Sequence, residues 1–349
     1  MLIVNAKVYT MAKEIISNGF IHIIGEKIAA VGDMKDLKIK DEDTLDLKGK
    51  TVDPGFIDAH THLGIFEDSL TFEGADGNEE NDPITPNLKA IDAINPMDRN
   101  FLEAVEAGVT TVISGPGSAN AIAGELVAMK TYGRRIDNMV VKSPVAIKFA
   151  LGENPKSVYS QKNQSPATRM ATAAIIREQL HKAKRYNDDK NEALLDEERE
   201  LPEYDAKCEA LIPLLNKEIP AHFHAHRADD IFTAIRIAKE FDIEYTLVHA
   251  TEGHLILEEL QKEGSTIFSG PFLTDRSKPE LKGLTPKSPA ILSQNGILTS
   301  IITDHPETPI NYLPLCAIIA VKEGMDEYEA LKSITINPAI TCKIDNVVG

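Results

Sequence analysis

The sequence predicts an α/β protein in which a (β/α)8 (TIM) barrel is joined to a small β-rich domain. The chain has 349 residues, more than the roughly 250–300 at which one hydrophobic core usually stops growing. From about residue 54 apolar strand segments alternate with helical segments, as in βα units around a parallel sheet. Residues 1–53 instead contain short β-rich stretches separated by turn residues, a pattern typical of a small antiparallel sheet or sandwich.

The strand candidates support both parts of this prediction. In the leading segment they lie at residues 2–9, 20–24, 27–31 and 44–47. In the rest of the chain they lie at residues 56–62, 109–115, 125–131, 139–149, 220–226, 245–250, 265–270 and 298–304. Helical patterns between them cover residues 98–107, 167–186, 231–241 and 255–263. Eight strands with intervening helices over about 250 residues fit a (β/α)8 barrel, although segment 125–131 could also begin a helix.

Two segments interrupt the alternation. Residues 64–96 are acidic and rich in Asn, Pro and Gly, and they directly follow the first barrel strand. A long loop there is expected to overhang the barrel mouth, where functional loops concentrate. Residues 187–210 are dense in charged side chains, which is typical of a solvated helix extension or a mobile insert.

Composition narrows the class of function. Lys and Arg number 37 against 54 Asp and Glu, so the formal net charge is −17. This balance disfavours binding to nucleic acid and to anionic membranes, which requires clustered basic residues. Three separated cysteines and an N-terminus without a signal-peptide pattern predict a cytoplasmic protein without a cysteine-built zinc site. The expected partner is a small-molecule substrate, and a homo-oligomer is left open.

Histidines gather at the ends of strand candidates. His60 and His62 occupy alternate positions of the first barrel strand, so both imidazoles point to one side and could bind one ion. His222, His224 and His226 alternate at the end of a later strand, so any of them could be a ligand, and His249 and Asp304 end two others. Because strand ends of a barrel converge on one mouth, the sequence predicts a metal site there. A pair of ordinary polar residues on an edge strand is the alternative for His60 and His62 taken alone.

These residues resemble a known family. The stretch Pro-Gly-Phe-Ile-Asp-Ala-His-Thr-His at residues 54–62, followed by His224, His249 and Asp304, is similar to the amidohydrolase superfamily, and most to its imidazolonepropionase-like branch. The resemblance implies a metal-dependent barrel at residues 54–343 and a small β-sandwich built from residues 1–53 with 344–349. Because further strands are expected where this chain ends, either the sequence is a fragment or the predicted sandwich is incomplete and has an exposed edge.

The resemblance also implies roles for the ligands. His60, His62 and Asp304 would bind one metal ion. His224 and His249 would bind a second ion, or would orient the substrate if only one is present. Zinc is favoured, with manganese, iron or cobalt as alternatives.

The resemblance also implies roles for four further residues. Lys148, carboxylated on its amine, would bridge two metals, because an unmodified ammonium cannot ligate a cation. Glu153 is the alternative bridging ligand. His226 would reach the substrate or support the ligands from behind, whereas His222 is expected to be structural.

The implied function is a metal-dependent hydrolase that cleaves a C–N bond in an amide or cyclic amide. A metal-activated water would attack, with Asp304 as general base and then general acid. Candidate substrates are a cyclic amide, an N-acyl amino acid and a dipeptide. The alternatives are a mononuclear deaminase or imidazolone-ring hydrolase, and a non-catalytic scaffold on the same fold.

Overall fold

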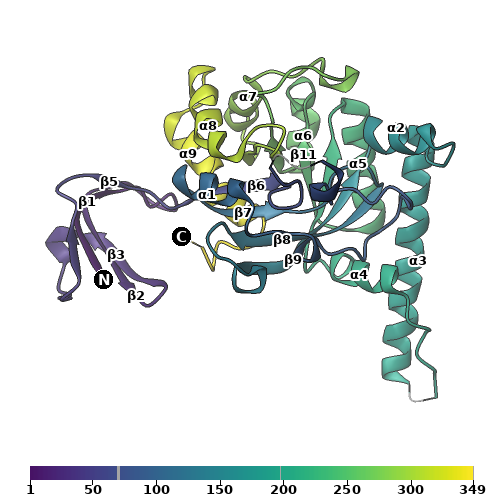
Figure 1. The fold of residues 1–349 in the computed structure, drawn as a ribbon, viewed down its shortest axis with the longest axis horizontal. Helices are drawn as coiled ribbons and strands as arrows, with labels where there is room; N and C mark the ends of the chain where they lie inside the picture. The colour runs from purple at the N-terminus through teal and green to yellow at the C-terminus, as the bar shows by residue number, and fades with distance from the viewer. Residues whose placement is uncertain (69–70, 197, 349) are drawn as a thin grey trace.

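The computed structural model describes residues 1–68, 71–196 and 198–348. Residues 69–70 of the long loop, residue 197 of the charged segment and residue 349 of the C-terminal segment lie outside the described residues. Figure 1 shows a small sheet at the N-terminal end set apart from a larger body of strands and helices.

The N-terminal sheet contains β1 to β5, at Leu2–Val8, Ile16–Ile24, Lys27–Asp33, Thr44–Asp46 and Thr51–Val52. Its order is β3-β2-β1-β4, and β5 also pairs with β1. The pairs β1–β2 and β2–β3 are antiparallel, but β4 and β5 run parallel to β1. The expected antiparallel sheet is therefore a mixed one, because the chain after β3 returns along the sheet before it forms β4. The second layer of a sandwich and the domain boundary stay predictions.

The large sheet confirms the predicted (β/α)8 barrel. It contains eight strands in the sequential order β13 to β6. They are β6 Phe56–Thr61, β7 Val109–Ser114, β8 Ile122–Lys130, β9 Val140–Ala150, β10 Ala221–Ala225, β11 Tyr245–His249, β12 Ile267–Ser269 and β13 Thr299–Ile301. Inside the barrel Ile57, Ile113, Val145 and Ile302 form an apolar cluster that also buries Ile344.

The third strand departs from the expected parallel arrangement. β8 runs antiparallel to both β7 and β9. Residues 115–121 connect β7 to β8 and contain no described helix, and so short a connection cannot carry a parallel crossover. The segment is a strand, so its alternative interpretation as a helix start is wrong.

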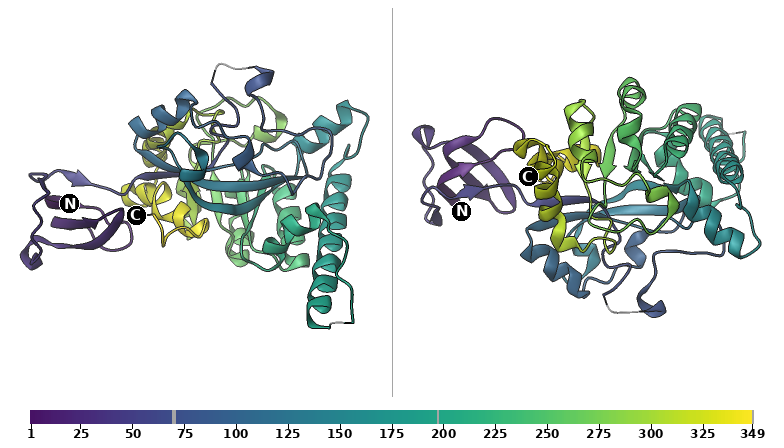
Figure 2. Two further views of the ribbon diagram at one scale, coloured as in Figure 1. Left: turned by 60° about the horizontal axis from the view of Figure 1, so that its bottom comes forward. Right: turned by 90° about the horizontal axis from the view of Figure 1, so that it is seen from above.

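Helices flank the other strands, as Figure 2 shows from two further sides. They are α1 Arg99–Glu106, α2 Glu153–Gln161, α3 Arg169–Leu195, α4 Ala206–Leu215, α5 Ala228–Phe241, α6 Leu257–Glu263, α7 Ser288–Gln294, α8 Leu313–Lys322, α9 Glu327–Ser333 and α10 Ile336–Thr341. Ile147 and Phe223 of the sheet pack with Ile176 of α3 and Ile235 of α5 in one buried cluster. α3 continues to Leu195 and extends past the barrel (Figure 1), so the first part of the charged segment, residues 187–195, is the predicted helix extension.

β6 and β13 meet at a seam of the barrel. Among the described residues no strand ladder joins them. Single hydrogen bonds close the seam instead. The Asp304 N–H donates to His60 O over 3.2 Å, and Thr303 donates to Asp58 Oδ2 from its N–H (3.1 Å) and its hydroxyl (2.6 Å). Asp58 is fully buried, so this carboxyl group holds the segment that carries Asp304.

Within the described residues, no helix combines the length and the apolar character needed to cross a membrane.

Candidate metal centre

The predicted ligands converge at one end of the barrel. His60 lies within β6, His224 within β10 and His249 at the end of β11, and Asp304 follows β13. A cavity of about 410 Å³ opens at this end, and His62, His224 and Asp304 line it. The strand ends therefore bring together side chains that are far apart in the sequence.

The ligating atoms form two groups, in each of which they lie within 4.8 Å of one another. In the first, Asp304 Oδ1 is 3.5 Å from His60 Nε2 and 3.4 Å from His62 Nε2. The second contains His224, His226 and His249, so His226, expected only near the substrate or behind the ligands, lies among the possible ligands. The groups are adjacent, with 5.9 Å between the His60 and His249 ring centroids.

Hydrogen bonds orient two of the imidazoles for metal binding. His62 Nδ1–H donates to Gly115 O, and His249 Nδ1–H donates to Gly270 O, each over 2.7 Å. These bonds place the proton on Nδ1 and leave the Nε2 lone pair of each ring free for a cation. His224 Nε2 is buried without a hydrogen-bond partner among the described residues. Free, neutral imidazole nitrogens facing a carboxylate fit a divalent cation such as zinc.

Electrostatics support the same protonation states. Burial lowers the pKa of His60, His224 and His226 well below the usual value and that of His249 to about 4. These rings are therefore neutral at physiological pH, as metal ligands must be. Burial raises the pKa of Asp304, but its interactions with His249, His62 and Lys148 outweigh this effect and lower the pKa to about 2. Asp304 is therefore ionised.

Lys148 and Glu153 lie in different places relative to these groups. Lys148 is fully buried on β9, and its Nζ donates to His60 Nε2 over 2.8 Å. Burial lowers the pKa of Lys148 to about 8. Glu153 begins α2. Among the described residues it belongs to neither ligand group. His222, expected to be structural, is fully buried beside the ring of Phe268, with 5.1 Å between the centroids.

The backbone is strained where two of the ligands lie. His249 has φ +71° and Asp304 has φ +53°, values in the left-handed region that residues with a Cβ adopt at a cost. Such strain persists where surrounding structure holds it and concentrates at functional sites. Here both strained residues follow or end barrel strands and belong to the ligand groups.

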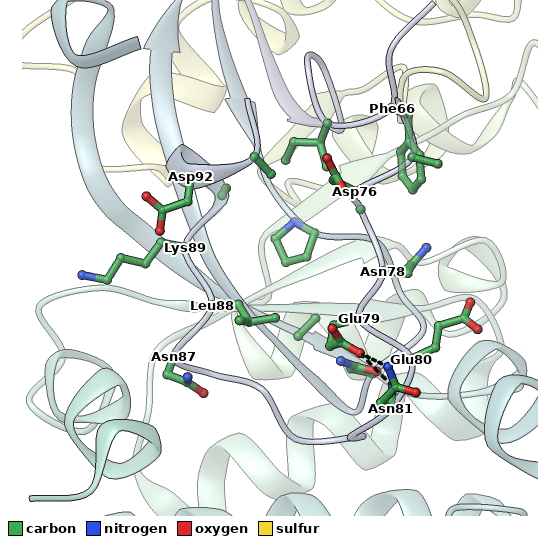
Figure 3. A pocket seen from close by; sticks show the side chains of 18 of the residues that line it. Phe66, Asp76, Asn78, Glu79, Glu80, Asn81, Asn87, Leu88, Lys89 and Asp92 are labelled. Carbon is green, nitrogen blue, oxygen red and sulfur yellow. Dashed lines mark hydrogen bonds between the residues drawn. The ribbon is translucent and has the colours of Figure 1, made fainter. Parts of the chain in front are cut away.

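The long loop after β6 forms a second cavity beside the first. This cavity is about 900 Å³, and Phe66 and Asn78 line both cavities. Phe66 packs edge-on against His62, with 5.6 Å between ring centroids. Figure 3 shows the acidic side chains Asp76, Glu79 and Glu80 around the second cavity. The described part of segment 64–96 therefore overhangs the barrel mouth, as predicted.

The sequence analysis missed a charged cluster in the wall of the first cavity. Lys278 lines the first cavity from the connection between β12 and α7. Glu280 lies beside it, with Oε1 3.1 Å from Lys278 Nζ and 3.8 Å from His226 Nε2. Neither residue ends a strand or belongs to a periodic pattern, so no signal in the sequence identifies them.

Gly152 is expected to be intolerant of a side chain, because the charged cluster leaves no space for one. A Cβ there would lie 2.8 Å from Glu280 Oε2 and 3.0 Å from Asp230 Oδ2, and the residue has φ +84°. We expect Gly152→Ala to lower the free energy of unfolding by about 2 kcal/mol or more, measured by urea denaturation. Gly296→Ala is the control, since Gly296 also has a positive φ (+73°) but nothing within 4 Å. Equal losses in both variants would contradict the steric argument.

Comparisons with known sequences point to one family. The model of the amidohydrolase family matches residues 51–349. A curated relative, amidohydrolase tasK from Hapsidospora irregularis, is 27% identical over 329 residues, which cover 87% of this chain and 33% of that protein. The chain thus spans about a third of the length of that relative.

Solved structures show the same fold. An amidohydrolase from Thermotoga maritima MSB8 superposes with a TM-score of 0.94 and 39% identity, over 100% of this chain and 90% of that one. A Xaa-Pro dipeptidase shares the fold alone, with a TM-score of 0.57 and 15% identity over 100% of this chain and 90% of that one. The match of the family model across most of the chain shows that the protein belongs to the amidohydrolase family.

Proposed function

We propose that the protein is a metal-dependent hydrolase that cleaves a C–N bond in an amide or cyclic amide. The observation that carries the proposal is the pair of adjacent ligand groups at the barrel mouth. Zinc is the metal we favour. The proposal is supported by the position of both ligand groups at the ends of the strands, where (β/α)8 enzymes carry out their chemistry.

Residues of this chain have distinct roles in the proposed reaction. His60, His62 and Asp304 would hold one cation, and His224 and His249 a second. When bound, such cations lower the pKa of water and polarise a carbonyl oxygen. The hydrogen bonds from His62 to Gly115 O and from His249 to Gly270 O keep those imidazoles oriented.

Asp304 would move the proton. Its carboxylate is ionised and lines the cavity, so it can accept a proton from the attacking water at an Oδ atom. It would then pass that proton to the nitrogen that leaves, acting first as general base and then as general acid. Asp58 supports this role because it holds Thr303, the residue before Asp304, through two hydrogen bonds.

The state of Lys148 separates the two-metal site from the mononuclear alternative. Unmodified Lys148 donates a hydrogen bond to His60 Nε2, and this bond has to break before that lone pair can bind a metal in either case. A deaminase or imidazolone-ring hydrolase with a single metal would keep Lys148 in this form. A carboxylated Lys148 would instead release His60 and offer oxygen ligands to two metals.

Metal removal tests the proposal directly. We expect EDTA followed by desalting to lower hydrolysis of the best amide substrate by roughly 1,000-fold, because the water and the carbonyl lose their activation. Adding zinc or manganese should restore the activity. The substrate is found by screening N-acyl amino acids, dipeptides and cyclic amides, with amine release as the signal.

The metal content has to be measured in the same samples by inductively coupled plasma mass spectrometry. Unchanged hydrolysis in protein shown to be metal-free would refute the proposal. Folded, metal-loaded protein that cleaves none of the three substrate classes would favour the scaffold alternative.

A further inference from the structure

The wall of the first cavity carries one basic side chain, which Glu280 links to His226 of the second ligand group. Among the described residues that line this cavity, Lys278 is the only lysine or arginine. Thr274 and Ser277, from the same connection, and Asn154, from α2, line the cavity with it. We propose that Lys278 binds a carboxylate of the substrate, which makes the substrate an acidic amide such as an N-acyl amino acid or a dipeptide. This inference rests on the proposed function.

The Lys278 side chain keeps a hydrogen-bond donor for a ligand. Its Nζ donates to Asn154 Oδ1 over 2.8 Å and lies 3.1 Å from Glu280 Oε1. An ammonium group has three N–H donors, so the two protein contacts leave a third. The side chain is 25% exposed, and the exposed part faces a cavity that His62, His224 and Asp304 also line.

Buried partners hold the Lys278 ammonium group in position. Glu280 is only 1% exposed, and its Oε2 accepts the Glu153 N–H at the start of α2 over 3.0 Å. Asp230, also buried, pairs with Arg169 over 3.0 Å. The two carboxylates and the two basic groups thus balance in charge. An anchor fixed in this way loses little side-chain freedom when a ligand binds, which raises affinity.

The charges around the cavity determine where an anion can bind. Asp304 and Glu307 line the side of the ligand groups, and the Glu307 N–H donates to Asp304 O over 3.0 Å. These two carboxylates repel a substrate carboxylate, whereas Lys278 attracts it. With the carboxylate on Lys278, the amide group of the same molecule would occupy the cavity that His224 and His62 also line.

This placement separates the candidate substrate classes. An N-acyl amino acid and a dipeptide each carry a carboxylate close to the scissile amide, but an uncharged cyclic amide does not. The cavity volume of about 410 Å³ lies within the range of small-molecule sites. The inference therefore favours the two acidic classes over the uncharged rings.

The test compares matched substrates. N-acetyl amino acids and the corresponding N-acetyl amino acid amides differ only in the charge of the group that Lys278 would bind. We expect the metal-loaded wild type to favour the acids by roughly 10- to 100-fold in kcat/KM, the range of a charge-assisted hydrogen bond. A wild type that treats acid and amide alike overturns the inference even if both are cleaved.

Variants assign the preference to Lys278. Lys278→Gln removes the charge but keeps a donor for Glu280, and we expect the acid-to-amide ratio to fall close to one, mainly through a higher KM for the acid. Lys278→Arg should restore part of the preference. Lys162→Gln is the matched control, because Lys162 pairs with Glu80 over 2.8 Å at the second cavity. A ratio that Lys278→Gln leaves unchanged refutes the assignment.

Binding distinguishes failure of this inference from failure of the proposed function. If the protein cleaves none of these compounds, isothermal titration of the metal-loaded wild type with the same acids and amides still measures the preference. Tighter binding of the acids that is lost in Lys278→Gln would support the anchor without hydrolysis. Equal binding of acid and amide would overturn it.

Discussion

Asp304→Asn is expected to lower kcat about 1,000-fold while the protein keeps most of its metal. The amide of asparagine still offers an oxygen to a cation, but it cannot accept the proton of the attacking water, and a positioned acid–base group contributes roughly 100- to 10,000-fold. Asparagine also tolerates the φ of +53° at this position, so the backbone should not change. The measurements are steady-state kinetics on the best amide substrate and metal content per chain.

The control for Asp304→Asn is a carboxylate outside the cavity. Asp137 is exposed in the connection between β8 and β9 and pairs with Arg135 over 2.7 Å, so Asp137→Asn should leave kcat unchanged. Activity of Asp304→Asn within about tenfold of the wild type would remove Asp304 from the proposed acid–base role.

Lys148→Met is expected to reduce the metal content from two equivalents to one and to lower kcat roughly 100-fold. Methionine has a similar length but no amine that could form a carbamate. Burial lowers the pKa of Lys148 to about 8, so a substantial fraction of the neutral amine is present to react with carbon dioxide. The second equivalent in the wild type should therefore depend on bicarbonate during expression and metal loading.

Lys142→Met provides the matched control, since Lys142 lies on the same strand, β9, away from the ligand groups. Its metal content should equal that of the wild type. A wild type that binds one equivalent with and without bicarbonate, and a Lys148→Met variant that keeps it, would identify the mononuclear alternative.

The barrel was predictable because its strands are apolar segments that alternate with helical segments, and this alternation is visible in the sequence. The direction of β8 was not, because a buried strand has the same pattern whichever way it runs. The parallel pairing of β4 and β5 with β1 escaped prediction for a related reason, since pairing depends on contacts between segments distant in the sequence. The hydrophobic pattern of a segment indicates whether it is buried. The direction of a strand and its pairing partners depend instead on how the connecting segments place it in the sheet.

The candidate metal ligands were predictable because barrel geometry gathers strand ends, and histidines at such ends are visible in a sequence. Lys278 and Glu280 were not, because an irregular connection has no period that indicates which way its side chains point. The same limit applies to Asn78, which reaches both cavities from the long loop. The residues that we expect to determine substrate specificity therefore lie in irregular loops, whose conformation is the hardest to predict from sequence.

A cation bound at the seam between β6 and β13 would stabilise the closed barrel. His60 and His62 belong to the first barrel strand and its end, and Asp304 follows the last strand, so one cation bound by all three would fasten the two edges of the sheet together. The same ion would then both close the barrel and take part in catalysis. Loss of the ion would allow local opening of the barrel next to Asp304, the proposed proton-transfer group. Activity would therefore be lost before the protein unfolds globally.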